Sequence, residues 1–154
     1  MRKSIIAILM TFCLSIMTYA QTPRDRATEL KEQAQSSLNQ KDYIKARYLF
    51  KKAYEAFATR ENYPQAIECG VQANALYVRE NFYKEGFELC RDMEQLLWTG
   101  EQNKKKVFYD LRFLINKERL QMYTALKNPA QAKTQLDKLE EMANLAKNDS
   151  LTEV

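Results

Sequence analysis

The side chains best suited to acid–base or metal chemistry are few in this chain. Its 154 residues include no histidine, the commonest general base and metal ligand. A catalytic base would have to be a carboxylate such as Glu118, Glu140 or Glu141, and no second residue is spaced to complete a catalytic pair with any of them. Each is more simply interpreted as a solvated charge on a helix. We therefore predict that the chain is not an enzyme and that it holds no metal or cofactor.

The cysteines and glycines offer little more chemistry. The three glycines are isolated from one another, so no clustered glycine loop is present to bind a phosphate. Cys69 and Cys90 lie beyond an N-terminal leader, and an exported chain with two cysteines can form a disulfide. In an antiparallel pairing of adjacent helices they are offset by about one turn, whereas a disulfide needs Cα atoms within about 7 Å. We favour two buried free thiols, and a disulfide is the alternative.

Residues 1–20 are typical of a secretory signal peptide. A short basic head at Arg2 and Lys3 precedes an apolar run over residues 5–17, and small residues stand at the first and third positions before a cut after Ala20. The apolar run is shorter than the roughly 17 to 25 residues of a membrane-spanning helix. We expect cleavage rather than a retained anchor. The protein is then exported, to the periplasm or outside the cell, and has no stable membrane insertion after cleavage.

The charge of the chain does not favour a nucleic-acid partner. The leader contains two basic residues and no acidic one, so its removal lowers the net charge of +4 to about +2. Export would also separate the protein from DNA. The basic run Lys104-Lys105-Lys106 could touch anionic headgroups, but one short run is usually solvated surface.

The elements that must position any site are helices. Tyr43, Ala46, Phe50 and Ala53 fall on one helical stripe, where small residues let a neighbouring helix come close and aromatic rings fill the space beside them. The same spacing recurs at Tyr83, Gly86, Cys90 and Met93, and again at Pro129, Ala132, Leu136 and Leu139. One helix cannot bury such a stripe alone. The recurrence predicts an all-α fold in which antiparallel helix pairs stack as a solenoid.

About six helices and no strand are expected in the mature chain. The helical domain spans residues 21–149, and its three pairs cover residues 22–60, 62–99 and 103–147. We expect the fourth helix to end at Gly100. The fifth should begin after Asn103 and be the most enclosed, because its first half is apolar nearly all round. The stripes begin 40 and then 46 residues apart, and both spacings exceed the roughly 34 residues of a minimal helix-pair repeat. We assign the surplus to the loops and to a long fifth helix.

The end of the chain resembles the start of another helix. Ser150 and Glu153 are spaced as a capping box, the motif that opens helices. Residues 150–154 are therefore predicted to begin a truncated next helix, with a short tail as the alternative. Further repeats or a downstream domain would follow Val154.

The stripe of Tyr43, Ala46, Phe50 and Ala53 resembles the second helix of the tetratricopeptide repeat family. That family's first helices line a concave, ligand-binding side. Carried over by position, the resemblance implies a binding surface of Lys31, Gln35, Leu38, Glu68, Val71, Ala75, Arg79, Leu114, Lys117 and Gln121. These residues mix both signs of charge, so they specify neither an acidic nor a basic ligand. Ordinary solvated helix faces are the alternative interpretation.

Two functions are compatible with such a scaffold. The first is a non-catalytic, exported scaffold that binds a peptide or a protein partner on its concave face. The alternative is the periplasmic sensory input portion of a longer membrane-bound signalling protein, a histidine kinase or a transcriptional regulator, here cut short. The two share a fold and differ in the segments expected beyond Val154.

Overall fold

The chain folds into six α-helices over the part that the structure describes. The computed structural model describes the backbone of residues 23–152 and the side chains of residues 26–148. The helices are α2 (Pro23–Asn39), α3 (Tyr43–Ala58), α4 (Tyr63–Arg79), α5 (Tyr83–Lys104), α6 (Tyr109–Ala125) and α7 (Pro129–Thr152). No strand occurs among these residues, which confirms the all-α fold. The leader expected over residues 1–20 lies outside them. None of the described helices is long and apolar enough to cross a membrane.

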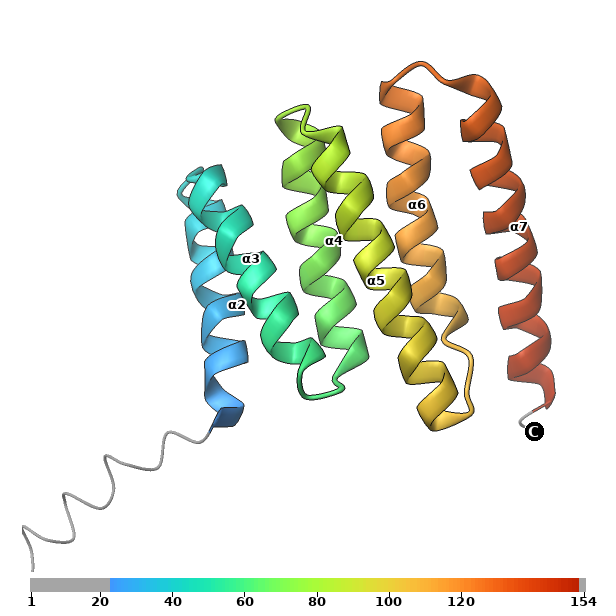
Figure 1. Ribbon diagram of the computed structural model, residues 1–154, viewed down its shortest axis with the longest axis horizontal. Helices are drawn as coiled ribbons and strands as arrows, with labels where there is room; N and C mark the ends of the chain where they lie inside the picture. The colour runs from blue at the N-terminus through green and yellow to red at the C-terminus, as the bar shows by residue number, and fades with distance from the viewer. Residues whose placement is uncertain (1–22, 153–154) are drawn as a thin grey trace, which may run out of the picture.

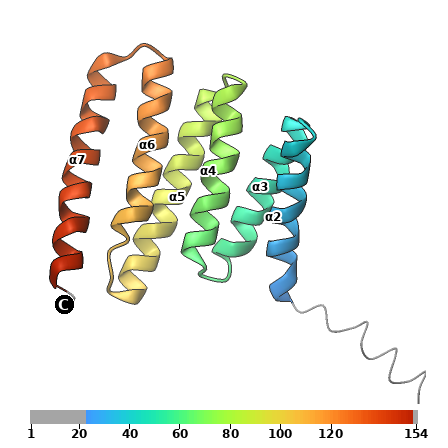
Figure 2. The same ribbon diagram turned by 180° about the vertical axis from the view of Figure 1, so that it is seen from behind.

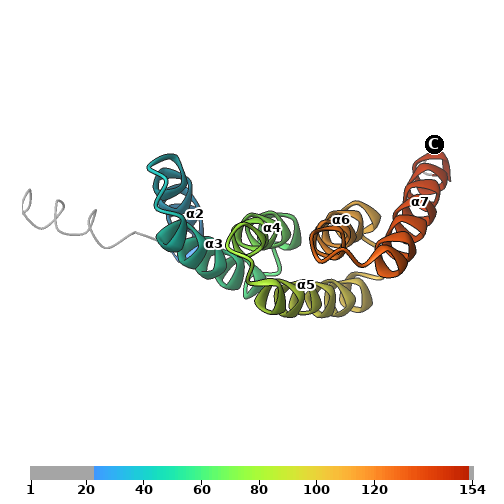
Figure 3. The ribbon, with the colours of Figure 1, turned by 90° about the horizontal axis from the view of Figure 1, so that it is seen from above.

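The helices stack in chain order as a curved array (Figure 1). Each packs mainly against its neighbours in the sequence, and α4 also contacts α6. Figure 3 shows α4 and α6 on the inner side of the curve, α3 and α5 on the outer side, and α2 and α7 at the two ends. The expected stacked arrangement of antiparallel helices is therefore confirmed.

Three of the turns between helices have the same construction. The side chains of Asp42, Asn62 and Asn128 each accept a hydrogen bond from the backbone N–H three residues later. These bonds satisfy N–H groups that the first turn of a helix leaves without partners. The residue before each cap has a left-handed backbone; these residues are Lys41, Glu61 and Lys127, with φ of 63°, 55° and 54°. Left-handed positions usually favour glycine, so composition alone does not reveal these turns.

The predicted stripe is the core of α3. Ala46 and Ala53 are fully buried, and the ring of Phe50 is only 1% exposed. In α5 the equivalent residues Gly86, Cys90 and Met93 are also buried. In α7 the stripe is only partly covered, because Leu139 is buried but Leu136 is 56% exposed. The prediction of small and bulky residues packed across helices is thus confirmed for α3 and α5 and holds in part for α7.

The prediction that the fourth helix ends at Gly100 is wrong. α5 continues to Lys104, and Gly100 lies buried within it. A Cβ atom on Gly100 would lie 2.5 to 2.8 Å from three carbons of the Tyr63 ring, so glycine here permits close packing rather than termination. α5 has 22 residues and α3 has 16, and this difference of six equals the difference between the stripe spacings of 46 and 40 residues. The extra six residues of the second spacing therefore lie in α5, and not in the loops or in α6, which has 17 residues like α4.

The fifth helix in the expected order also differs from its prediction. α6 begins at Tyr109 rather than after Asn103, because α5 occupies that segment and a left-handed Lys105 ends it. Nor is α6 the most enclosed helix: its buried residues are Ile115, Asn116, Glu118 and Met122. The remaining apolar side chains of its first half are only partly buried, because one side of α6 faces the inside of the curve (Figure 3).

No new helix begins at Ser150. α7 continues through this position to Thr152, so residues 150–152 belong to α7 rather than to a separate element. The physical reason is that no glycine or proline interrupts the sequence between Ala146 and Thr152. The last two positions of the chain lie outside the described residues.

Candidate functional site

A hollow lies between α2 and α4, the two first helices of neighbouring pairs. Its volume is about 430 Å³, and it is lined by Thr28, Lys31, Glu32 and Gln35 of α2, Phe57 of α3, Asn62 at the α3–α4 turn and Gln65 of α4. Figure 2 shows the array from the side on which α2 lies in front of α3, and α4 and α6 lie in front of α5. Of the residues predicted for a concave binding surface, Lys31 and Gln35 line this hollow.

Lys31 connects the two sides of the hollow. Its Nζ atom donates hydrogen bonds to Oε1 of Gln65 at 2.9 Å and to Oε2 of Glu68 at 2.7 Å. The Lys31 side chain is 28% exposed and that of Glu68 is 49% exposed, so solvent reaches both groups. The ring of Phe57 is buried beneath them. The hollow therefore combines an apolar floor with a polar rim that carries charges of both signs, from Lys31, Glu32 and Glu68.

The other predicted surface residues are spread along the inner helices. The apolar residues Leu38, Val71 and Leu114 are half-buried and pack against the core, so each presents only part of its side chain. The small and polar residues Ala75, Lys117 and Gln121 are exposed on α4 and α6.

Arg79 is a special case among the predicted residues. It is exposed, and its guanidinium lies 4.0 Å from the ring centroid of Tyr43, which ties it to α3.

Sequence reasoning missed several lining residues of the hollow. Two of them, Thr28 and Glu32, precede the predicted residue Gln35 on one side of α2 at spacings of four and three residues, and this periodicity is a signal that was available in the sequence. Gln65 and Phe57 come from other elements, so only the packing of α2 against α3 and α4 brings them to the same place.

A buried polar pair joins α4 to α6. Asn74 is fully buried and Glu118 is 4% exposed, and Nδ2 of Asn74 donates a 2.9 Å hydrogen bond to Oε2 of Glu118. Burial raises the pKa of Glu118, and the hydrogen bond from Asn74 opposes this shift only in part. The interpretation of Glu118 as a solvated charge is therefore wrong. Its place between the buried residues Ile115 and Met122 is the sequence signal for burial.

Two arginines of α6 bind glutamates of α5. Glu101 accepts hydrogen bonds from Nε of Arg112 at 2.8 Å and from the backbone N–H of Phe108 at 2.9 Å, and Nη2 of Arg112 binds its second oxygen. Arg119 pairs with Glu94 through two bonds of 2.5 and 2.7 Å. Burial acts to raise the pKa of Glu101, but Arg112 and the Phe108 N–H outweigh it, so this pKa lies below its usual value.

The two cysteines are buried and free. Burial raises the pKa of the Cys69 thiol to about 11 and that of Cys90 to about 12, so both thiols are neutral and unreactive at ordinary pH. The interpretation as two buried free thiols is confirmed. In the described part of the chain no three Asp, Glu or Cys side chains are grouped to hold a metal ion.

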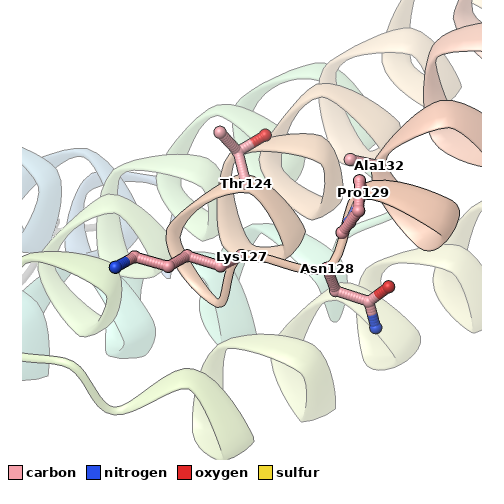
Figure 4. A pocket seen from close by; sticks show the side chains of 5 residues that line it. All are labelled: Thr124, Lys127, Asn128, Pro129 and Ala132. Atoms are coloured by element: carbon pink, nitrogen blue, oxygen red, sulfur yellow. The ribbon is translucent and has the colours of Figure 1, made fainter.

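A second hollow, of about 480 Å³, lies at the α6–α7 turn and is lined by Thr124, Lys127, Asn128, Pro129 and Ala132. In Figure 4 the polar groups of Thr124, Lys127 and Asn128 point in different directions. A small-molecule site needs a few polar groups that converge on one ligand. We therefore regard the α2–α4 hollow as the better candidate.

Comparison with known proteins returns no match, whether to a protein-family model, to a curated protein or to a solved structure. The function must therefore be inferred from the geometry of the molecule itself.

Proposed function

We propose that this chain is a non-catalytic helical-repeat module, a divergent tetratricopeptide-like array, whose concave face binds an extended peptide or a helix of a protein partner. The observation that supports this most directly is the hollow between α2 and α4. It has an apolar floor at Phe57 and a rim of hydrogen-bonding side chains that includes Lys31, Gln35 and Gln65.

The rim suits a polypeptide better than a strongly charged ligand. Lys31 is paired with Glu68, so its charge is largely compensated, whereas the amides of Gln35 and Gln65 can both donate and accept hydrogen bonds. A peptide main chain offers the complementary N–H and C=O groups, and one of its apolar side chains can contact the Phe57 ring.

The scaffold presents this face in a preformed state. The Asn74–Glu118 hydrogen bond joins α4 to α6, and the ion pair of Glu94 with Arg119 joins α5 to α6. Because these contacts already fix the helices, the protein loses little conformational entropy when a partner binds. The same contacts engage the carboxylates of buried Glu118 and half-buried Glu94, which favours a binding role over a catalytic one.

The setting that we propose is outside the cytoplasm, in the periplasm or beyond it. The basis is the signal-peptide pattern of residues 1–20 together with the modest charge of the remaining chain.

A second candidate function is the sensory input portion of a longer membrane-bound signalling protein. The observation that favours it is the outer face of α7. Leu136 occupies the position at which α3 buries Phe50 and α5 buries Cys90, yet it is 56% exposed. A following helix would cover it, as in a longer array. Reading the DNA downstream of Val154 distinguishes the two functions, since the sensory protein requires a transmembrane segment and an output domain there.

Site-directed crosslinking tests the binding function. A photoreactive amino acid at Gln35, on the rim of the hollow, should capture a partner from a cell-envelope extract, whereas the same group at exposed Lys84 on α5 should not. The captured protein, once purified, should bind the chain about tenfold more weakly when Lys31 is changed to Glu, because the ion pair becomes a like-charge contact with Glu68. Binding that is unchanged by Lys31→Glu and Gln35→Ala together would refute a concave site.

A further inference from the structure

A third hollow lies on the outer face of α3. It has a volume of about 380 Å³, and its lining includes Ile44, Tyr48 and Lys51 of α3 and Tyr77 of α4. Ile44 is 68% exposed and Tyr48 is 61% exposed, and the two side chains lie one helical turn apart. Figure 3 shows α3 on the outside of the curve, whereas α4 and α6 line the inside. This surface is therefore distinct from the concave face.

One wall of the hollow is held rigidly by Arg47. Its guanidinium forms an ion pair with Glu80 at the α4–α5 turn. The same group lies 4.8 Å from the ring centroid of Tyr77 and 5.2 Å from that of Phe82. Cation–π contacts of this kind fix an arginine between its neighbours. Phe82 is itself 44% exposed, so apolar surface continues beyond Arg47 at the edge of the hollow.

The outer face of α3 also carries positive charge that is not compensated. Lys52 pairs with Glu55 at 2.7 Å, and Arg47 pairs with Glu80. Lys45 and Lys51 are exposed on the same helix, and no ion pair to either forms among the described side chains. An apolar strip with two uncompensated ammonium groups beside it is complementary to a segment that contains both apolar and acidic residues.

We infer that this outer surface docks a protein segment that carries an aliphatic or aromatic side chain and, about one helical turn away, a carboxylate. The apolar side chain contacts Ile44 and Tyr48, and the carboxylate pairs with Lys51 at the side of the hollow. An anionic membrane is the less suitable partner, because Glu55 and Glu80 lie on the same surface and because the surface is hollowed rather than flat.

A random library of 12-residue peptides displayed on phage, panned against the purified chain, tests this inference. The expected consensus combines an aliphatic or aromatic residue with Asp or Glu. A synthetic peptide of that consensus should bind about tenfold more weakly to Tyr48→Ser and to Lys51→Glu proteins. Two control proteins should bind the peptide with unchanged affinity. One carries Lys133→Glu, a matched charge reversal at an exposed position of α7, and the other carries Gln35→Ala in the concave hollow. A version of the peptide with Lys in place of its acidic residues should not bind.

Three results would overturn the inference. The first is a failure of the peptide experiment: either the consensus lacks acidic residues, or the consensus peptide still binds to both the Tyr48→Ser and the Lys51→Glu proteins. The second is co-sedimentation with phosphatidylglycerol vesicles that these two substitutions abolish, which would assign the surface to a membrane. The third is a concentration-dependent dimer that Tyr48→Ser dissociates, which would assign it to a second copy of the chain. Both side chains are exposed, so the helical circular dichroism of the variants should match that of the unsubstituted protein and confirm that they are folded.

Discussion

Tyr63 lies where the start of α4 meets the end of α5 and the start of α6. The Tyr63 ring faces Gly100. The centroid of this ring lies 5.5 Å from the ring centroid of Phe108 and 4.9 Å from Nζ of Lys104. These neighbours leave the ring little room to move when an atom is added at Gly100. The tight contact explains why a glycine is needed inside a helix, where it otherwise destabilises by about 1 kcal/mol relative to alanine.

We predict that Gly100→Ala destabilises the protein, although alanine is the better helix former. The added Cβ would lie within 2.8 Å of three Tyr63 ring carbons, and overpacking of this kind lowers the free energy of unfolding by about 1 to 3 kcal/mol. Chemical denaturation measures the change. In a Tyr63→Ala background the same substitution should be neutral or stabilising. Equal effects in both backgrounds would show that the ring contact does not require the glycine.

The buried glutamates Glu118 and Glu101 are predicted to act in opposite directions on the pH dependence of stability. The pKa of Glu118 is raised in the folded protein. The contribution of Glu118 to the free energy of unfolding is therefore fully present below the usual pKa of 4.5 and is lost as the pH rises through the folded pKa. The pKa of Glu101 is lowered in the folded protein. The contribution of Glu101 to the free energy of unfolding is therefore present above the usual pKa of 4.5 and is lost as the pH falls through the folded pKa.

Unfolding free energies measured from pH 3 to pH 8 test this pair. Glu118→Gln keeps an acceptor for Asn74 and removes the buried charge, so it should stabilise the protein at pH 7 by about 1 kcal/mol and have little effect at pH 4. Glu101→Gln should destabilise it at pH 7, because Arg112 loses a charged partner, and much less at acidic pH. If both variants shifted stability in the same direction at pH 7, the assigned environments would be wrong.

Single residues were the level at which the sequence was least informative. Glu118 has the charge of a surface residue, and only the burial of Ile115 and Met122 on the same stripe of α6 places it inside. The polarity of a side chain favours exposure on average, but a buried partner such as Asn74 reverses that preference. Such a partner comes from a distant part of the chain and is not visible from local spacing.

At the scale of the helix, the same stripe position has different surroundings in different pairs. Phe50 of α3 is 1% exposed and is covered by its neighbours, whereas Leu136, at the equivalent position of α7, is 56% exposed. We predict that Phe50→Ala lowers the free energy of unfolding by about 3 to 5 kcal/mol, the usual loss for a truncated buried ring. Leu136→Ala should change it by less than about 0.5 kcal/mol.

The comparison of these two variants by urea denaturation is internally controlled, since both remove an apolar side chain from the same register. A loss of less than about 1 kcal/mol for Phe50→Ala would show that the α3 stripe is not core. A large loss for Leu136→Ala would mean that the α7 face is covered in solution, by another copy or by the rest of a longer chain.

The helices themselves were largely predictable where turn chemistry is explicit. Asp42 and Asn62 are residue types that favour the N-cap position, and α3 and α4 begin directly after them, at Tyr43 and Tyr63. The boundary between α5 and α6 was not predictable in this way. There the chain turns at a left-handed Lys105, while the nearby glycine at Gly100 serves packing instead of termination.

The whole molecule is a nearly one-dimensional stack of helices, and the recurrence of the stripe in the sequence predicts this stack. The sequence predicts less well which helices form the inner and outer faces. The hollow between α2 and α4 depends on how far apart the curve of the array holds these helices, and Lys31 reaches Gln65 and Glu68 only at that separation. Curvature is the sum of small rotations between pairs, which local sequence patterns do not specify.

Stability in such a stack should vary from helix to helix, and α7 should be the least stable unit of the C-terminal half. α7 packs chiefly against α6, whereas α3 packs against both α2 and α4. Its buried residues are few, and Gln135 and Leu139 are the only ones among its described side chains. Local opening of α7 therefore exposes less apolar surface than opening of α3, so it should require less free energy.

Hydrogen exchange followed by mass spectrometry should show this directly, with backbone amides of residues 129–148 exchanging faster than those of α3 and α4. Leu139→Ala should accelerate exchange in α7 and leave α3 unchanged, because it removes a buried contact that only the terminal unit makes. Leu89→Ala is the matched control: it truncates a similarly buried leucine of α5 and should accelerate exchange in the neighbouring helices α4 and α6 as well. Uniform acceleration by both variants would mean that the six helices open as one cooperative unit and that the nearest-neighbour description does not apply.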